Sequence, residues 1–131
     1  MTTARNPQDV HLPVADYVHQ IEIGGGGRWL VLSGQIGMRP DGSLPEDPVE
    51  QVTVALENLR RNLAAAGMDV TDVVKLNTYL VGEVDAQARA AAVGAFLGEH
   101  TPTQTLLYVA GLAAPALRVE IEAWAHAAAH G

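Results

Sequence analysis

The chain has 131 residues, of which eight are Lys or Arg and 15 are Asp or Glu, so its formal net charge is −7. A surface of this sign repels the phosphate backbone, and nucleic acid is therefore not an expected partner. The chain has no cysteine, which excludes disulfides, thiolate nucleophiles and zinc–thiolate sites.

No apolar stretch approaches the roughly 20 residues that a membrane-spanning helix needs. Residues 1–10 lack the apolar segment of a secretory signal. These observations predict a cytoplasmic protein with no membrane partner. The length predicts a single domain over residues 1–131, with 1–14 and 126–131 expected to be flexible.

The first half of the chain predicts two strands, at 17–23 and 29–37, separated by four glycines at 24–27. A phosphate-binding loop would need a Gly-Lys-Ser/Thr after the glycines, and none follows. We therefore predict a turn between two antiparallel strands. Strict alternation in 29–37 would place Ser33 and Gln35 on the same face as Trp29 and Val31.

Two helices are expected, over 48–66 and 85–97. Asp47 is a plausible N-cap for the first, Pro48 suits its first position, and Glu50 completes a capping-box-like pattern. An apolar stripe runs along this helix, and Gly67 follows it as a C-terminal stop. The second helix is rich in alanine and ends at Gly98. A strand rich in β-branched residues lies between them, at 73–81.

The C-terminal strands are expected at 103–113 and 117–125. The second alternates without a break, with small or apolar side chains on one face and Arg118, Glu120, Glu122 and Trp124 on the other. The polar face could be solvated, or it could line a cleft in which a carboxylate handles protons. Periodicity alone leaves both interpretations open.

The predicted order is β-β-α-β-α-β-β, which indicates an α+β fold: a mixed sheet with two helices on one face. The other face would then expose Trp29, Val31 and Trp124. Burial of such a face in a self-association interface is the expected solution.

The sequence resembles the RidA/YjgF family, also called Rid or L-PSP. The resemblance is carried by YVHQ at 17–20, VLSGQIG at 31–37, QVTVALENLRRNLAAAGMDVTDVVKLNTYL at 51–80, FLGEHTPTQT at 96–105 and VEIEAWA at 119–125. It implies a chorismate-mutase-like fold and a homotrimer with clefts between subunits. Better-known members use these clefts to hydrolyse enamines or imines such as 2-aminoacrylate to a 2-keto acid and ammonia.

By the same resemblance, Tyr17 and Ser33 match substrate-binding positions. Glu120 matches the catalytic glutamate that positions a water, and no cofactor is implied. Gln104 stands where deaminating members have the arginine that binds the substrate carboxylate. Leu106, Ala90 and Gly111 also depart from the family pattern. A neutral amide binds a carboxylate more weakly than a guanidinium does, so we expect an altered substrate and weak activity on 2-aminoacrylate.

Three hypotheses follow. The first is a Rid-family hydrolase with a small-molecule ligand in an intersubunit cleft. The second is a trimer that binds a ligand or partner without catalysis, and the third is an endoribonuclease, which the acidic charge disfavours. Arg118 is a possible substitute for the missing cation, although a solvated role is also open. His126 and His130 have a metal-compatible spacing only if the tail is helical, and a frayed tail is the expected alternative.

Overall fold

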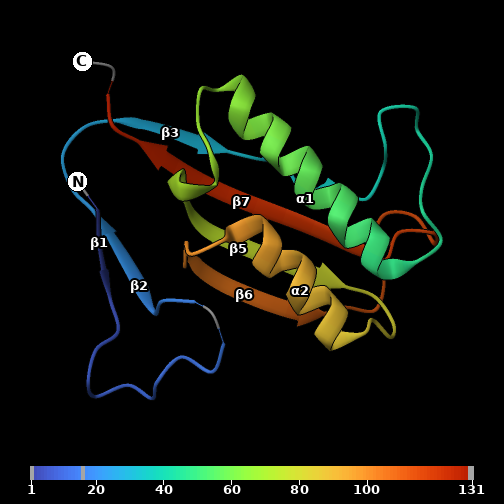
Figure 1. The fold of residues 1–131 in the computed structure, drawn as a ribbon, viewed down its shortest axis with the longest axis horizontal. Coiled ribbons are helices and arrows are strands. Elements are labelled where there is room, and N and C mark those ends of the chain that lie inside the picture. The colour runs from blue at the N-terminus through green and yellow to red at the C-terminus, as the bar shows by residue number, and fades with distance from the viewer. Residues whose placement is uncertain (1, 16, 130–131) are drawn as a thin grey trace.

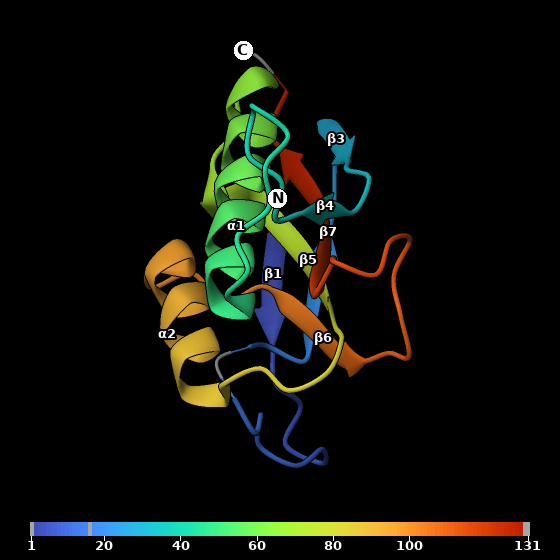
Figure 2. The same ribbon diagram turned by 90° about the vertical axis from the view of Figure 1, so that its right-hand side faces the viewer.

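The structure, a computed structural model, has a layer of two helices packed against one face of a sheet (Figures 1 and 2). The structure describes residues 2–15 and 17–129. In chain order the elements are β1 (Thr2–Arg5), β2 (Gln20–Ile23), β3 (Arg28–Val31), β4 (Gln35–Ile36), α1 (Pro48–Ala65), the 3-10 helix η1 (Val70–Asp72), β5 (Val73–Leu80), α2 (Ala86–Leu97), β6 (Thr103–Tyr108) and β7 (Val119–Ala127).

The main sheet has the strand order β3-β7-β5-β6, and β4 also pairs with β7. Strands β5 and β6 are parallel, and the other pairs are antiparallel. Helix α2 makes the crossover that a parallel pair requires. The predicted α+β fold, a mixed sheet with two helices on one face, is confirmed.

Helix α1 begins and ends where its sequence predicts. The Asp47 carboxylate accepts a hydrogen bond from the Val49 backbone amide, and Pro48 occupies the first turn. At the other end Gly67 has a φ of 71°, and the amides of Gly67 and Met68 donate to Ala64 and Leu63. This pairing satisfies the last carbonyls of the helix, and glycine adopts the required conformation without strain.

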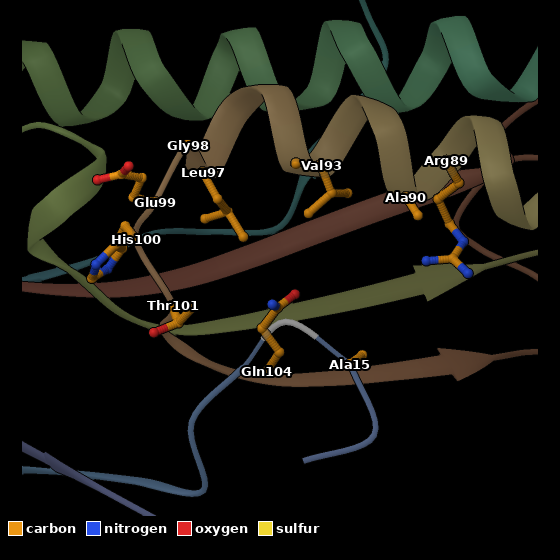
Figure 3. A pocket seen from close by; sticks show the side chains of 11 residues that line it. Ala15, Arg89, Ala90, Val93, Leu97, Gly98, Glu99, His100, Thr101 and Gln104 are labelled. Atoms are coloured by element: carbon orange, nitrogen blue, oxygen red, sulfur yellow. The ribbon is translucent and has the colours of Figure 1, made fainter.

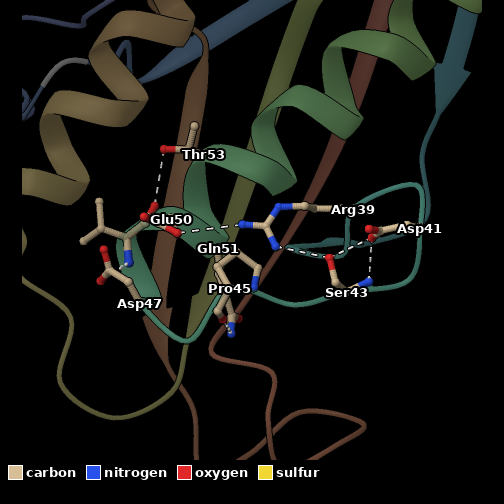
Figure 4. Close-up of polar contacts among 9 residues, drawn as sticks. Arg39, Asp41, Ser43, Pro45, Asp47, Glu50, Gln51 and Thr53 are labelled. Atoms are coloured by element: carbon tan, nitrogen blue, oxygen red, sulfur yellow. Dashed lines mark hydrogen bonds and ion pairs between the residues drawn. The ribbon is translucent and has the colours of Figure 1, made fainter.

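A buried glutamine connects the start of α1 to the chain around it (Figure 4). The Gln51 amide nitrogen donates to the carbonyls of Pro45 and Ala116, and its oxygen accepts from the Arg118 backbone amide. A buried amide is costly unless its hydrogen bonds are made, and here donor and acceptor both have partners. The Glu50 carboxylate lies 3.8 Å from an Arg39 nitrogen.

The core lies between the helices and the sheet. Residues of α1 pack there against the apolar side of β7, where Val119, Ile121 and Ala123 have no exposed surface. Full burial of a residue such as Leu59 removes a large apolar area from water, worth roughly 2–3 kcal/mol per side chain. The alternation predicted for 117–125 is therefore confirmed on its apolar side.

The predicted strand 29–37 is interrupted. Val31 pairs with Trp124 and Gln35 with Ile121, so three residues, 32–34, lie opposite the two residues 122 and 123. The extra residue is a β-bulge, and it reverses the side to which the following residues point. Gln35 accordingly accepts a hydrogen bond from Asn62 of α1. The prediction that Gln35 shares a face with Trp29 and Val31 was wrong for this reason.

The ends of the chain also differ from expectation. The glycines at 24–27 do not close a hairpin, because β2 pairs with β1 in a separate two-stranded sheet while β3 pairs with β7. Thr2–Arg5 forms a strand that the sequence did not predict. Strand β7 extends to Ala127 and includes His126, which is buried rather than part of a frayed tail. His130 lies outside the described residues.

The two C-terminal strands are not neighbours, because β5 lies between β6 and β7.

Within residues 2–15 and 17–129, no helix is long and apolar enough to cross a bilayer.

Candidate functional site

The sheet face that points away from α1 and α2 carries the polar side of β7. We call it the open face and define it by Trp29, Val31, Lys75, Asn77, Tyr79, Glu120, Glu122 and Trp124. Paired residues of neighbouring strands point to the same side, and the register places Tyr79 beside Glu120 and Asn77 beside Glu122.

Glu120 lies against the glycine of the SGQ segment. A Cβ atom on Gly34 would lie only 2.1 Å from the Glu120 Oε2 atom, so no larger residue fits there without moving the carboxylate. Ser33 precedes this glycine and is exposed. The structure thus places two of the predicted site residues, Ser33 and Glu120, at neighbouring positions.

Glu122 is distinguished from Glu120 by its partners. The Tyr79 hydroxyl donates to Glu122 at 2.5 Å, and the Asn77 amide nitrogen donates at 3.1 Å. The hydrogen bond to Glu122 raises the pKa of Tyr79, with smaller contributions from desolvation and from the charges of Glu122 and Glu120. Among the described residues Glu120 has no such hydrogen-bond donor, so its carboxylate is the one available to a water or a ligand.

Gln104 lies on the opposite side of the sheet. It pairs with Leu76, which in turn pairs with Ala123, and both of these partners are buried beneath the helices. Gln104 lines a cavity of about 430 Å³ between β6 and α2 (Figure 3). Ala90, which the family resemblance identified as a departure, lines the same cavity.

The segment that carries Tyr17 lies beside the start of β6. The Val18 amide donates to the carbonyl of Pro102, which holds this segment beside the start of β6. Ala15 lines the Gln104 cavity. The Tyr17 hydroxyl accepts from the Val14 amide at 3.3 Å, and its ring packs edge-to-face with His19.

Two of the four predicted site residues therefore lie on opposite sides of the sheet: Gln104 points to the helix side and Glu120 to the open face. Ser33 adjoins Gly34, which lies against Glu120, while Tyr17 lies in the segment bonded to Pro102 and does not line the Gln104 cavity. Within one chain a small molecule cannot contact both Gln104 and Glu120.

Arg118 has a structural role that the sequence did not indicate. Its side chain donates to the carbonyls of Val81 and Glu83 at 2.8 and 2.9 Å, so it fixes the loop after β5. It neither replaces the missing cation near Gln104 nor extends freely into solvent.

His126 also packs structurally, with its ring 4.9 Å from that of Trp29. The part of the chain that the structure describes contains no cluster of three metal-ligating side chains.

Arg89 is a cavity residue that the sequence reasoning missed. It lies on α2 beside Ala90 and lines the same cavity as Gln104. A single arginine in an alanine-rich helix was the available signal, but helical periodicity alone could not show that it faces the sheet edge.

Comparison with known proteins supports one family. The sequence matches the family described as "Endoribonuclease L-PSP" over residues 8–127. It is 31% identical over 114 residues to the 2-iminobutanoate/2-iminopropanoate deaminase of Escherichia coli strain K12, covering 84% of this chain and 86% of the relative.

Solved structures agree with this match. The Rid-family protein YyfB of Yersinia pestis superposes with a TM-score of 0.86 at 33% identity, covering 96% of this chain and 98% of that one. TdcF of E. coli with bound serine superposes with a TM-score of 0.71 at 29% identity, covering 96% of each chain. The sequence match over most of the chain and the shared fold show that this protein belongs to the RidA/YjgF family.

Proposed function

We propose that this protein hydrolyses small imines or enamines in clefts between the subunits of a homotrimer. Family membership and the similarity to the E. coli 2-iminobutanoate/2-iminopropanoate deaminase support the reaction class. The similarity to TdcF with bound serine supports a small-molecule ligand.

The separation of the predicted site residues carries the proposal. Gln104 and Glu120 point to opposite sides of the sheet, so one substrate can contact both kinds of residue only where two copies meet. The open face also leaves Trp29, Val31 and Trp124 about half exposed, at 54, 57 and 46%. Packing this face against another copy would bury these side chains and complete the site.

The chemistry follows from the groups available. The Glu120 carboxylate accepts a proton from a water molecule while the water oxygen adds to the imine carbon. The proton then passes to the nitrogen and gives a carbinolamine. The hydroxyl proton of this intermediate moves to the nitrogen as the C–N bond breaks, and the products are a carbonyl compound and ammonia. Tyr17 and Ser33 supply hydroxyl groups that can hold the substrate.

Gln104 sets the expected substrate range. Its neutral amide replaces a charged, two-pronged contact, and the difference between charged and neutral hydrogen bonds is about 1 kcal/mol or more. That corresponds to roughly tenfold weaker binding of an anionic substrate. Imines and enamines that carry this carboxylate, such as 2-aminoacrylate, should therefore be poor substrates.

The test is release of keto acid from imines that an amino-acid oxidase or a threonine dehydratase generates in situ. We expect slow turnover of 2-aminoacrylate by the wild type and a faster rate for Gln104→Arg. Recovery should be partial, because Leu106, Ala90 and Gly111 still differ from the deaminase pattern. A wild-type rate equal to that of an arginine-bearing Rid protein would contradict the proposed role of Gln104.

Glu120 is tested in the same assay with a matched variant two residues away. Glu120→Gln should abolish hydrolysis while the protein stays folded, whereas Glu122→Gln should keep most of it, because Glu122 is already bonded to Tyr79 and Asn77. Unchanged activity in Glu120→Gln would remove this carboxylate from the mechanism.

A non-enzymatic ligand-binding trimer is the second candidate, and the neutral Gln104 is the observation that favours it. Ligand binding without turnover of any imine, in the wild type and in Gln104→Arg, would support that alternative. An endoribonuclease is disfavoured by the net charge of −7. Salt-dependent RNA binding and cleavage would be needed to support it.

A further inference from the structure

Within residues 2–15 and 17–129, Arg89 is the basic residue whose side chain has no polar partner. The other seven basic side chains contact a carboxylate, a carbonyl or a side-chain oxygen; they are Arg5, Arg28, Arg39, Arg60, Arg61, Lys75 and Arg118. In the described part of the chain, the buried Nε atom of Arg89 has no hydrogen-bond partner. A buried donor of a charged group is costly when unpaired, so this position calls for an acceptor.

Helix α2 contains no acidic residue that could supply this acceptor, and its N-cap does not supply it either. Asp85 precedes Arg89 by four positions, a spacing that allows an ion pair on a helix. The Asp85 carboxylate instead accepts from the Ala88 amide at 2.8 Å as the N-cap of α2. No ion pair between Asp85 and Arg89 is present among the described residues, and the guanidinium faces the cavity instead.

Arg89 extends from α2 into the cavity that Gln104 lines (Figure 3). Glu99 and His100 lie at the opposite end of this cavity. The His100 Nε2 atom lies 2.7 Å from the carbonyl oxygen of Val73. The cavity thus has a cationic end at Arg89, a neutral amide at Gln104 and a distant acidic end.

We propose that Arg89 binds the carboxylate of the substrate, in place of the arginine that Gln104 replaces on β6. The identity of the anion rests on the proposed function, because imino acids and their keto-acid products carry a carboxylate. A guanidinium is charged at all physiological pH values and donates two parallel hydrogen bonds to a carboxylate. The anchor is on the helix rather than on the strand, so the carboxylate lies closer to α2.

This placement changes which substrates fit. A carboxylate held by α2 positions the imine carbon differently from one held by β6. In every 2-imino acid the carboxylate is bonded directly to the imine carbon, so this shift also moves the reacting carbon and should slow the turnover of 2-aminoacrylate. A carboxylate anchor at Arg89 on α2 therefore agrees with the weak activity on 2-aminoacrylate that we propose.

The experiment measures binding of 2-oxobutanoate, a stable keto acid, to the intact protein by calorimetry or NMR titration. We expect Arg89→Gln to weaken binding at least tenfold and Arg89→Lys, which keeps the charge but loses the two-pronged contact, to weaken it less. Arg61→Gln removes the same charge from an exposed pair with Glu57 and should leave binding unchanged. The neutral amide of 2-oxobutanoate should bind wild type and Arg89→Gln equally.

Equal binding by wild type and Arg89→Gln would overturn the inference, and so would equal losses in Arg89→Gln and Arg61→Gln. Absence of wild-type binding, or tighter binding of inorganic phosphate than of 2-oxobutanoate, would also overturn it. Glutamine is a good helix former, and circular dichroism checks that α2 is retained. Arg89-dependent carboxylate binding without imine turnover would preserve this inference while refuting the proposed hydrolase function.

Discussion

The two faces of the main sheet differ in how completely their apolar side chains are covered. On the helix side of β7, Val119, Ile121 and Ala123 are completely covered by α1 and by the neighbouring core. On the open face, Trp29, Val31 and Trp124 remain about half exposed and lie in the same sheet face as Glu120 and Glu122. The first face supplies the stability of a single chain, while the second would be covered only in the proposed trimer.

Strand β7 contributes to both faces because its side chains alternate: one set packs in the core and the other lies on the open face. Substitutions on its two faces should therefore have separable effects, one on folding and the other on assembly and activity. The following experiments test that separation.

The largest effect is expected from Leu59→Ala in α1. Leu59 has no exposed surface and packs in the core beneath the helices. Its truncation should lower the free energy of unfolding by about 2–5 kcal/mol, since the surrounding residues only partly fill the cavity that remains. Urea denaturation at one fixed protein concentration measures this change.

The control is Arg61→Ala on the exposed side of the same helix. It removes only a solvent-exposed ion pair with Glu57, which should cost no more than about 0.5 kcal/mol. Similar losses in the two variants would show that the helix side does not dominate stability.

The second experiment concerns the open face. Val31→Asp places a charge among apolar side chains that the proposed trimer would bury, so it should dissociate the assembly without unfolding the chain. Light scattering coupled to size exclusion measures the mass. We expect a trimeric wild type and a smaller species for Val31→Asp.

Gln87→Asp adds the same charge at an exposed position of α2 and should remain trimeric. A monomeric wild type at micromolar concentration would refute the assembly. A trimeric Val31→Asp would show that another surface holds the subunits together.

Much of the fold could be predicted because its signals are local. Asp47, Pro48 and Gly67 mark the ends of α1 through capping chemistry that depends on a few neighbouring residues. The alternation in β7 indicated the buried face because side chains on a strand have a period of two. The same pattern predicted that Trp29, Val31 and Trp124 would be exposed on the open face, as they are in the single chain.

The remaining features depend on contacts between distant parts of the chain. The bulge at 32–34 arises from the register of two short strands against β7, and no local pattern marks it. The insertion of β5 between β6 and β7 is likewise a matter of topology.

Alternation placed Glu120 and Glu122 on one face but could not separate them. Their difference comes from Asn77 and Tyr79 on the adjacent strand. The position of Arg89 beside Gln104 also required the three-dimensional structure.

The smallest expected effect is the titration of Tyr79, which sharpens the distinction between the two carboxylates of the open face. The pKa of Tyr79 is raised above its ordinary value of about 10, mainly by its hydrogen bond to Glu122. Because the folded pKa exceeds the unfolded one, the stabilising contribution is complete below about pH 10. It is lost as the pH rises through the higher folded value.

Phenolate absorbance can follow this residue alone in a protein that also carries Tyr17→Phe and Tyr108→Phe. Glu122→Gln removes the charged acceptor and should lower the pKa of Tyr79 toward 10. Glu120→Gln should lower it less, because Glu120 acts only through its charge and is the smallest contributor. Equal decreases in the two variants would mean that the short hydrogen bond to Glu122 does not distinguish these carboxylates in solution, and the assignment of Glu120 as the available one would lose its structural support.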